Sequence, residues 1–566
     1  MTLDRIGFAL ATGLLLVPIS CRAQESPDPR PLRGPSVDSL IAVFEAEIPA
    51  RIEEEGLPGA SIVIVDAEGP VWSAAFGMTA KRGGAAVDDR TIFSVQSMSK
   101  TVTATGVLMA VRDGLVDLDE PIVTYLPDFT VHSRFEPHPE GVITLRHLLS
   151  HHAGFTHEAP IGNNYDPSYP SFEAYIRSIS DTWLRYPVGD RYSYSNLGVD
   201  LAGYILERVS GVPFPTYIRE VVLEPLGMTR SSFDWGEIRA DANRAAGHAN
   251  GYDRVPLEFG LIPSGAFYST AEDIGKFIRF HMNGAQVDGR RLLPADLHGQ
   301  LLAIQFRRER QESGYGLGLG RYVRRGTHFY NHNGGGFGFQ SHMAWYPEWG
   351  FGLTILTNDD SNGLTGGFAF GLADRLADAA LGEMTSGRPS YPDVEPDPTA
   401  TPDVARLAGH YLVPSGGDIR LEVQDGILAL ALGGRTAPLA FTDDLEALLA
   451  MGPTRFLLRF SVDGTGRPVS MTRVNDATVL DYNGGPADPP GPDRDAWASY
   501  EGTYRYSIWG QVHVDTSLER RDGYLYFGDL RMEEHEPGLF FSTTGEALDL
   551  RADAPTWRNI RLTKID

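Results

Sequence analysis

The sequence predicts a large α/β region followed by two small antiparallel β domains. Residues 36–385 mix strand-like and helix-like patterns, and Ala60–Val65 and Phe351–Leu356 are typical of strands. Two proline-rich segments then interrupt the chain, at Pro389–Pro402 and Gly484–Pro492. Proline runs of this kind are typical of linkers. A chain of 566 residues is also long enough for about three domains.

Two runs in the first region are typical of helices. Thr101–Val111 is followed by Gly114, and Leu201–Val209 is followed by Gly211. Glycine just past such a run often ends a helix, because it adopts the left-handed conformation without strain. We therefore expect two helices that stop near these glycines.

The two segments after the first linker resemble each other. Leu407-Ala-Gly-His-Tyr411 recurs as Tyr500-Glu-Gly-Thr-Tyr504, and alternating segments around an Asp-Gly turn follow each copy. Two small antiparallel β domains are the simplest account. The expected boundaries are a signal at 1–23, the α/β region at 36–385, linkers at 386–402 and 484–494, and β domains at 403–483 and 495–566.

The composition excludes several kinds of function. The 49 Lys and Arg against 74 Asp and Glu give a formal net charge of −25, and so acidic a chain disfavours nucleic acid as a partner. Cys21 is the only cysteine. Disulfides, thiolate zinc sites and iron–sulfur clusters within one chain are therefore excluded, and we expect no cofactor.

The N-terminus is typical of an export signal. Residues 6–20 form a short apolar stretch behind Arg5, and cleavage after Ala23 fits the preference for small residues at such sites. We expect an exported protein, periplasmic or secreted. Two alternatives remain: a lipid anchor on Cys21, or a retained N-terminal helix. No later stretch is long enough to predict a transmembrane helix.

Ser97 and Lys100 form the first candidate catalytic motif. They are three residues apart where the sequence turns helical, so both side chains are expected on one helix face. Serine becomes a competent nucleophile when a neighbouring base removes its proton, and a lysine with a lowered pKa can be that base. The alternative is a plain helix cap, because Ser-x-x-Lys occurs by chance in many chains.

Tyr194 and Asn196 form a second motif, just before the helix expected at Leu201–Val209. A tyrosine beside a lysine ammonium can shuttle protons, and an asparagine offers both a donor and an acceptor to a substrate amide. Taken alone, the pair is equally consistent with helix capping and packing.

His332, Gly334 and Gly335 form a third motif within a run of glycines. Glycines beside a strand let a substrate lie against the backbone, whose N–H groups can stabilise an oxyanion. The alternative is a tight turn between strands. A phosphate-binding loop is disfavoured, because no Lys-Ser or Lys-Thr follows.

The order of the three motifs resembles the serine β-lactamase and penicillin-binding protein superfamily, in particular its class C β-lactamase and D-aminopeptidase branch. Further stretches agree with this resemblance, at Pro58–Val65, Ile143–Gly154 and Pro263–Asp273, and it covers residues 40–385. It implies an α/β fold in which helices flank an antiparallel sheet beside an all-helical region. The two C-terminal β domains also resemble those of D-aminopeptidases, where similar domains help to gate the site.

The resemblance implies a role for each motif residue. Ser97 corresponds to the acylated nucleophile, Lys100 to its base, and Tyr194 to a partner in proton transfer to the leaving group. The same resemblance implies that Asn196 binds the acyl-side amide and that His332 lies across the cleft from Tyr194. The backbone N–H groups of Ser97 and Gly335, which follows Gly334, are implied to form the oxyanion hole.

One departure from the family pattern bears on the substrate. β-Lactamases have Lys-Thr-Gly where this chain has His332-Asn333-Gly334, and histidine is mostly neutral at pH 7. This favours a small peptide or amide, in particular one with a D-amino acid, over a β-lactam. Short-chain esters and wall-peptide carboxypeptidation remain alternatives.

A metal site is one alternative to the serine motifs. The histidine pairs His147/His151 and His328/His332 have the spacing of metal ligands, and Glu158 could contribute a third ligand. The absence of a Gly-x-Ser-x-Gly motif disfavours an α/β-hydrolase. A wall- or peptide-binding protein with an inactive site is the non-enzymatic alternative.

Overall fold

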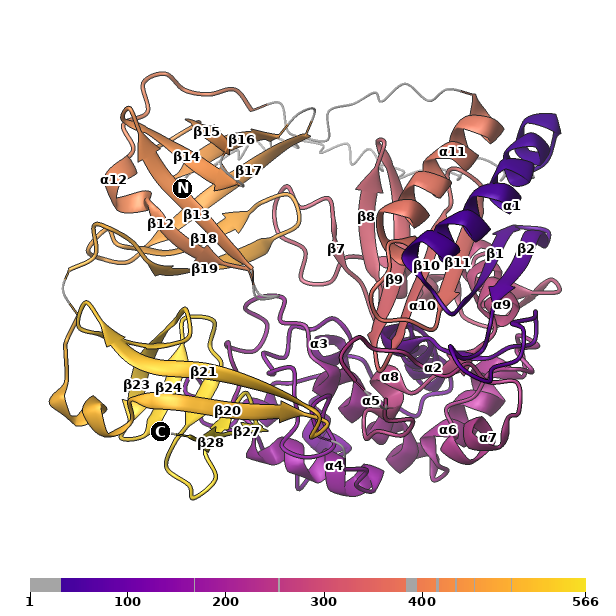
Figure 1. Cartoon of the computed structure of the whole chain (residues 1–566), viewed down its shortest axis with the longest axis horizontal. Helices are drawn as coiled ribbons and strands as arrows, with labels where there is room; N and C mark the ends of the chain where they lie inside the picture. The colour runs from indigo at the N-terminus through magenta and orange to yellow at the C-terminus, as the bar shows by residue number, and fades with distance from the viewer. Residues whose placement is uncertain are drawn as a thin grey trace, which may run out of the picture.

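A computed structural model (Figure 1) describes residues 32–565 except 167, 253–254, 383–393, 414–416, 433–434, 452–453 and 490. The predicted export signal with Cys21 lies outside the described residues, as does the start of the first predicted linker. Within the described ranges, no helix combines the length and the apolar character needed to cross a membrane.

A seven-stranded sheet forms the centre of the first region, in the order β2-β1-β11-β10-β9-β8-β7. Its neighbouring strands are antiparallel. In the middle of this order β1 pairs with β11, the last of these strands in the sequence, and Ile62 lies opposite Ile355. The strands are β1 (Gly59–Asp66), β2 (Pro70–Gly77), β7 (Gly314–Tyr315), β8 (Gly320–Arg324), β9 (Thr327–Gly336), β10 (Phe339–Tyr346) and β11 (Phe351–Thr357).

Helices cover both faces of this sheet. Successive residues of β1 point to opposite faces, so Ile62 packs in one core with α1 (Pro35–Glu55) and α11 (Ala369–Leu381). Val63 packs in the other core with α9 (Ala271–Met282). Figure 1 shows α1 and α11 together on one side of the sheet. The expected antiparallel sheet flanked by helices is confirmed.

A helical region packs beside the sheet. Its centre is α2 (Ser99–Arg112), which is buried from Ser99 to Ala110 and contacts the neighbouring helices. The expected end of α5 at Gly211 is also observed, with that glycine in the left-handed conformation. The other helices are α3 (Leu145–Leu149), α4 (Phe172–Ser178), α5 (Asn196–Ser210), α6 (Phe214–Ile218), α7 (Trp235–Ala240), α8 (Ile262–Gly265) and α10 (Ala295–Leu302).

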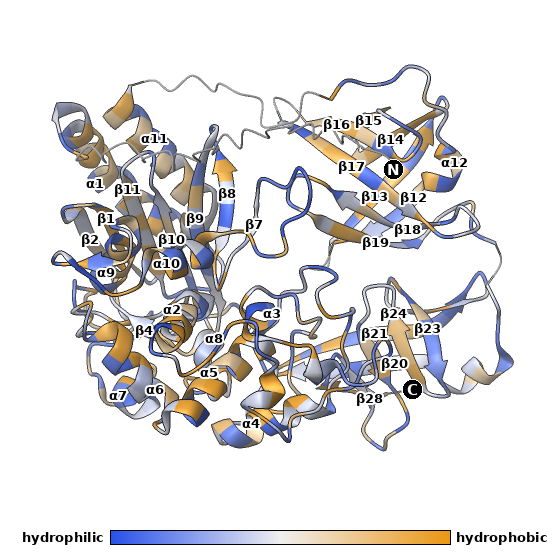
Figure 2. Ribbon diagram, turned by 180° about the vertical axis from the view of Figure 1, so that it is seen from behind, coloured by the Kyte–Doolittle hydropathy of each residue, from blue (hydrophilic) through white to orange (hydrophobic). Residues whose placement is uncertain are grey.

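Residues 409–484 form a closed antiparallel barrel around an apolar core that contains Tyr411. Figure 2 shows hydrophobic and hydrophilic residues alternating along its strands, as expected when one face lines a core. Its elements are α12 (Val404–Leu407), β12 (Gly409–Leu412), β13 (Asp418–Gln424), β14 (Ile427–Leu432), β15 (Arg435–Phe441), β16 (Glu446–Met451), β17 (Thr454–Val462), β18 (Pro468–Arg473) and β19 (Thr478–Gly484).

The last segment forms a nine-stranded antiparallel sheet, in the order β27-β26-β25-β24-β23-β22-β21-β20-β28. Its strands are β20 (Gly502–Ile508), β21 (Val512–Arg521), β22 (Tyr524–Phe527), β23 (Leu530–Glu536), β24 (Leu539–Ser542), β25 (Ala547–Asp549), β26 (Thr556–Trp557), β27 (Ile560–Arg561) and β28 (Thr563–Lys564). Two small sheets of two strands each complete the first region. One pairs β3 (Phe93–Ser94) with β4 (Tyr268–Ser269), and the other pairs β5 (Gln286–Val287) with β6 (Arg290–Arg291).

The short sequence repeat adopts the same local structure in both β segments. Tyr411 donates its hydroxyl proton to the carbonyl of Leu407 at 2.8 Å, and Tyr504 donates to the carbonyl of Tyr500 at 2.7 Å. In each copy a tyrosine therefore bonds back to the residue four positions earlier, at the start of the first strand.

Candidate active site

Ser97 lies in a strained turn at the start of α2. A 3₁₀ turn at Gln96–Met98 runs directly into the helix, and Gln96 holds a left-handed backbone with φ 51°. That conformation costs a non-glycine residue on the order of 1–3 kcal/mol and is most often found at functional sites. Ser99 ties the turn down, because its Oγ donates to the Gln96 carbonyl and accepts from the N–H of Phe267.

Lys100 lies in the first turn of α2, three residues after Ser97, and is fully buried. Its ammonium donates to Ser97 Oγ at 3.0 Å, to Asn196 Oδ1 at 2.7 Å and to the carbonyl of Ser264 at 2.9 Å. An ammonium has three donors, and all three are used here. The structure thus brings together Ser97, Lys100 and Asn196, which are far apart in the sequence.

Tyr194 contacts Lys100 through the face of its ring. Lys100 Nζ lies 4.9 Å from the ring centroid of Tyr194, which is a cation–π geometry. Three histidine rings also surround Tyr194, with centroid separations of 4.4 Å for His151, 5.7 Å for His157 and 6.4 Å for His332. Tyr194 is therefore surrounded by ionisable side chains.

His332 lies on β9 and is buried. Its Nδ1 is 2.7 Å from the carbonyl oxygen of Asn333, and its Nε2 is 2.7 Å from the hydroxyl of Tyr315. Because a carbonyl only accepts, Nδ1 carries the proton, and Nε2 accepts from Tyr315. Burial and the nearby Lys100 lower the pKa of His332 to about 3, so the ring is neutral at physiological pH.

The glycines of the third motif bring β9 against the turn that carries Ser97. A Cβ at Gly334 would lie 2.1 Å from the Val95 carbonyl oxygen and 2.4 Å from Ser341 Oγ. Only glycine fits there. The next residue, Gly335, has open space around its Cβ position.

Asn196 begins α5, and its amide does not cap the helix. Ser195 occupies the N-cap position, but its hydroxyl donates to the carbonyl of Thr156 at 2.6 Å. The Ser195 N–H donates to His151 Nδ1 at 3.2 Å, so this nitrogen of His151 is an acceptor. The backbone entering the helix is held by these contacts, and the Asn196 amide oxygen faces Lys100.

Sequence reasoning missed the support beneath Lys100. Asp200, one turn along α5 from Asn196, accepts from the Ser264 N–H at 2.8 Å, from Ser264 Oγ at 3.0 Å and from Tyr175 at 2.7 Å. Burial raises the pKa of Asp200 to about 7. The signal in the sequence was a carboxylate inside an otherwise apolar helix. Gly203 contributes a close approach, since a Cβ there would lie 2.3 Å from Pro263 of α8.

Two cavities adjoin Tyr194, and both β segments help to line them. One has a volume of about 790 Å³ and is bounded by Tyr194, Tyr315, Arg473 and Arg558, among others. The second has a volume of about 560 Å³ and includes His332. Residues 474–477, between β18 and β19, contact the α/β region next to both cavities, where the Asn475 carbonyl accepts from the Glu312 N–H at 2.9 Å.

Trp509, at the β20–β21 turn, reaches the α/β region. Its indole N–H donates to the Asn164 carbonyl at 2.8 Å, and its backbone N–H donates to the Tyr165 carbonyl at 2.9 Å. The ring stacks on Phe337, just beyond the glycines of β9, with centroids 5.3 Å apart. The last β segment therefore packs against the loop that follows the third motif.

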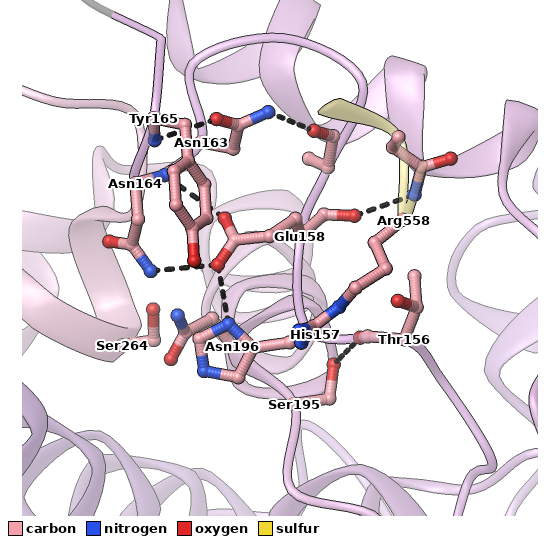
Figure 3. Close-up of polar contacts among 12 residues, drawn as sticks. Thr156, His157, Glu158, Asn163, Asn164, Tyr165, Ser195, Asn196, Ser264 and Arg558 are labelled. Atoms are coloured by element: carbon pink, nitrogen blue, oxygen red, sulfur yellow. Dashed lines mark hydrogen bonds and ion pairs between the residues drawn. The ribbon is translucent and has the colours of Figure 1, made fainter. Parts of the chain in front are cut away.

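The first histidine pair considered for a metal site bonds to backbone N–H groups instead. His147 Nδ1 accepts from Thr144, and His151 Nδ1 accepts from Ser195. Glu158 pairs with His157 and belongs to neither histidine pair (Figure 3). Within the described ranges, no group of three or more His, Cys, Asp or Glu residues is arranged to hold a metal ion.

Comparison with known proteins agrees with this geometry. The Beta-lactamase family model matches residues 44–376, more than half of the chain. Penicillin-binding protein 4 of Amycolatopsis lactamdurans is 27% identical over 391 residues, which cover 65% of this chain and 97% of that protein. Unguisins hydrolase ungD' of Aspergillus campestris is 26% identical over 401 residues, covering 67% and 73%.

Among solved structures, SurE aligns with a TM-score of 0.55 and 25% sequence identity, and covers 79% of this chain and 98% of SurE. SurE has also been solved with D-Leu. The family model, the relatives and the fold agree on one assignment. The chain belongs to the beta-lactamase family, within the superfamily of serine β-lactamases and penicillin-binding proteins, and is a serine hydrolase.

Proposed function

We propose that the protein hydrolyses small peptides or amides through an acyl-enzyme on Ser97. The observation that carries this proposal is the 3.0 Å contact between Ser97 Oγ and the fully buried Nζ of Lys100. Serine needs an adjacent base, and this amine is the nitrogen base in contact with it.

The bonds of Lys100 suggest how it acts as the base. When Nζ loses one proton, its two remaining N–H groups stay on Asn196 and Ser264. Its lone pair is then directed at Ser97 Oγ. Ser97 attacks the substrate carbonyl carbon, and its hydroxyl proton moves to Nζ.

The leaving amine departs with a proton. The C–N bond breaks as the amine takes this proton from Lys100, with Tyr194 sharing the transfer. Water then attacks the acyl-enzyme, which releases a carboxylic acid and restores Ser97. Because Lys100 must be neutral, activity rises from acidic towards neutral or mildly alkaline pH.

The remaining motif residues bind the substrate in this proposal. The N–H groups of Ser97 and Gly335 stabilise the oxyanion, and losing one such donor typically costs on the order of 10²–10³ in rate. Asn196 binds the acyl-side amide. His332 contributes a neutral hydrogen-bonding group beside Tyr194.

We favour substrates with a D-amino acid or a small N-terminal residue. Two observations support this choice: the similarity to SurE, a protein solved with D-Leu, and a neutral His332 where β-lactamases carry a lysine. Short-chain esters are the second candidate, and β-lactams or wall-peptide carboxypeptidation the third.

The test is a parallel assay with a D-alanyl anilide, a short acyl ester and a chromogenic cephalosporin. We expect the anilide to give the highest kcat/KM, and Ser97→Ala to abolish turnover of all three. Ser499→Ala, at an exposed serine in the short 3₁₀ helix before β20, is the control. Unchanged turnover by Ser97→Ala would refute the proposal, and no turnover of any of the three by the wild type would favour an inactive binding protein. Strong inhibition by a chelator would revive a metal site.

We also propose that the protein is exported, with a signal at 1–23, and that it divides into domains at 36–385, 403–483 and 495–566. The apolar N-terminal stretch and the separate cores of the three segments support this. Mass spectrometry of the secreted N-terminus, with lipid labelling of Cys21 as the second arm, decides between a soluble and an anchored protein.

A further inference from the structure

Arg558 occupies a strained turn in the last sheet. It lies between β26 and β27, where Arg558 has φ 52° and Asn559 has φ 67°. Two central residues with positive φ define a tight hairpin turn that favours Asn and Gly, and an arginine there is costly. The Asn559 side chain holds the turn in place by donating to the Glu158 carbonyl at 2.7 Å. The turn thereby places Arg558 on the wall of the 790 Å³ cavity.

A buried carboxylate orients the Arg558 guanidinium. Glu546 lies 3.3 Å from Arg558 Nε and 3.2 Å from Arg185 Nε, and it accepts from Thr156 at 2.6 Å. Burial opposes ionisation of Glu546, but Arg185 and Arg558 hold its pKa below the usual value. Two arginines therefore share this one carboxylate, which faces the Arg558 guanidinium from its Nε side.

The rest of the Arg558 guanidinium remains available. Its Nε faces Glu546, and within the described residues no protein acceptor bonds its two terminal nitrogens. One third of the side chain is exposed. These nitrogens form the planar fork that matches a carboxylate.

His157, in the α/β region, also contacts a buried carboxylate. Its Nδ1 lies 2.5 Å from Glu158 Oε1, and Glu158 also accepts from the N–H and the amide of Asn164, each at 3.0 Å. Glu158 is fully buried. Figure 3 shows the second ring nitrogen of His157 turned away from this carboxylate, with Arg558 extending from the last sheet towards the histidine.

His157 also adjoins the catalytic centre. Its ring stacks on Tyr194, with centroids 5.7 Å apart and an angle of 22° between the planes. Its side chain is 27% exposed and lines the same cavity as Arg558. His157 from the α/β region and Arg558 from the last sheet thus line one cavity that adjoins Tyr194.

We propose that Arg558 binds a carboxylate group of the substrate. This inference rests on the proposed function and narrows the substrate to peptides or amides with an acidic side chain or a free C-terminal carboxylate. The guanidinium supplies both the charge and the donors, whereas the neutral ring of His157, whose Nδ1 proton is directed at Glu158, presents Nε2 as an acceptor. His332 lines the other cavity and is neutral, so it offers no such charge.

The test compares substrates that differ only in a carboxylate. One pair is the anilides of D-Glu and D-Gln, and the other is D-Ala-Gly and D-Ala-glycinamide. We expect the wild type to prefer the acid in at least one pair. In Arg558→Gln we expect KM for that acid to rise about 10- to 100-fold, the size of a hydrogen bond to a charged group, with kcat/KM for the matching amide unchanged.

Two variants serve as controls. Arg308→Gln removes a positive charge from the same cavity without touching Glu546 or His157 and should keep the acid preference. Arg558→Lys keeps the charge and loses the fork, so it should retain part of the preference. Melting temperatures establish that each variant is folded. An equal loss in Arg308→Gln, or no acid preference in the wild type, would overturn the proposal.

Failure of the proposed function gives a different result. If the wild type turns over none of these compounds, the enzymatic proposal fails. The carboxylate site is then tested by calorimetry with glutarate and glutaramide. Binding of glutarate alone, lost in Arg558→Gln, supports the site, and equal or no binding of both overturns it.

Discussion

Lys100 Nζ lies closer to Asn196 Oδ1, at 2.7 Å, than to Ser97 Oγ, at 3.0 Å. The asparagine thus has a structural role that its sequence motif does not reveal: it accepts a hydrogen bond from the lysine that also contacts Ser97. The acceptor in this position is an amide oxygen, which carries no charge.

Asn196→Asp should therefore move the acidic limb of the pH–rate profile to higher pH. A carboxylate next to Lys100 favours the ammonium, and an opposite charge at this distance shifts a pKa by about one to three units. The measurement is kcat/KM against pH for wild type and variant, with melting temperatures as the control for folding. An unmoved limb would show that Lys100 is not the base.

Asp200 predicts a pH-dependent stability. Its pKa in the folded protein is about 7, above its ordinary 3.8. The folded state thus keeps a proton that the unfolded state releases, so this group's contribution to stability is present below about pH 4 and is lost as the pH rises to about 7.

Asp200→Asn removes this titration while keeping an oxygen that can accept from Ser264. We expect its melting temperature, relative to wild type, to become more favourable as the pH rises from about 4 to about 8. Thermal unfolding across that range is the measurement. A difference that is constant with pH would mean that Asp200 does not titrate in the folded state.

Gly334→Ala should disrupt the site locally. The added Cβ would meet the Val95 carbonyl oxygen at 2.1 Å, so β9 must move away from the turn that carries Ser97. Overpacking of this kind costs about 1–3 kcal/mol of stability, and we expect kcat/KM to fall by about 10²-fold through the displaced oxyanion donor. Gly299→Ala in α10, where a Cβ meets nothing within 4 Å, is the matched control. Wild-type activity in Gly334→Ala would contradict the close approach.

Trp509→Ala should widen the range of accepted substrates. Its ring stacks on Phe337, and its N–H bonds to Asn164, so removing it opens the region beyond β9. We expect kcat/KM for a bulky substrate to rise relative to that for a D-alanyl anilide. Trp509→Phe keeps an aromatic ring that can stack on Phe337 but is smaller and lacks the indole N–H, and it should stay closer to wild type than Trp509→Ala. Equal changes for large and small substrates would show that Trp509 only supports the fold.

The sequence predicted the features that depend on residues close together in the chain. Ser97 and Lys100 are one helical turn apart, and Gly211 ends α5 as expected. The repeat around Tyr411 and Tyr504 also appears as a shared local structure, because each tyrosine bonds only four residues back along the chain.

Contacts between residues far apart in the chain left no comparable signal in the sequence. Asp200 and Ser264 meet through helix packing between α5 and α8, and Tyr315 of β7 reaches His332 of β9 although β8 lies between the two strands. Arg558 comes from the far end of the chain and lies in a turn with no motif of its own. Such contacts depend on the tertiary fold, and the sequence shows only that a polar residue sits in an unexpected place.

The most direct test of the central claim is to trap the acyl-enzyme. The wild type is quenched in acid during turnover of a slow D-alanyl ester or a penicillin and is then digested for mass spectrometry. The account predicts a mass increase of one acyl group on the peptide that contains Ser97, and none in Ser97→Ala. An acyl group on another residue, or turnover that persists in Ser97→Ala, would contradict it.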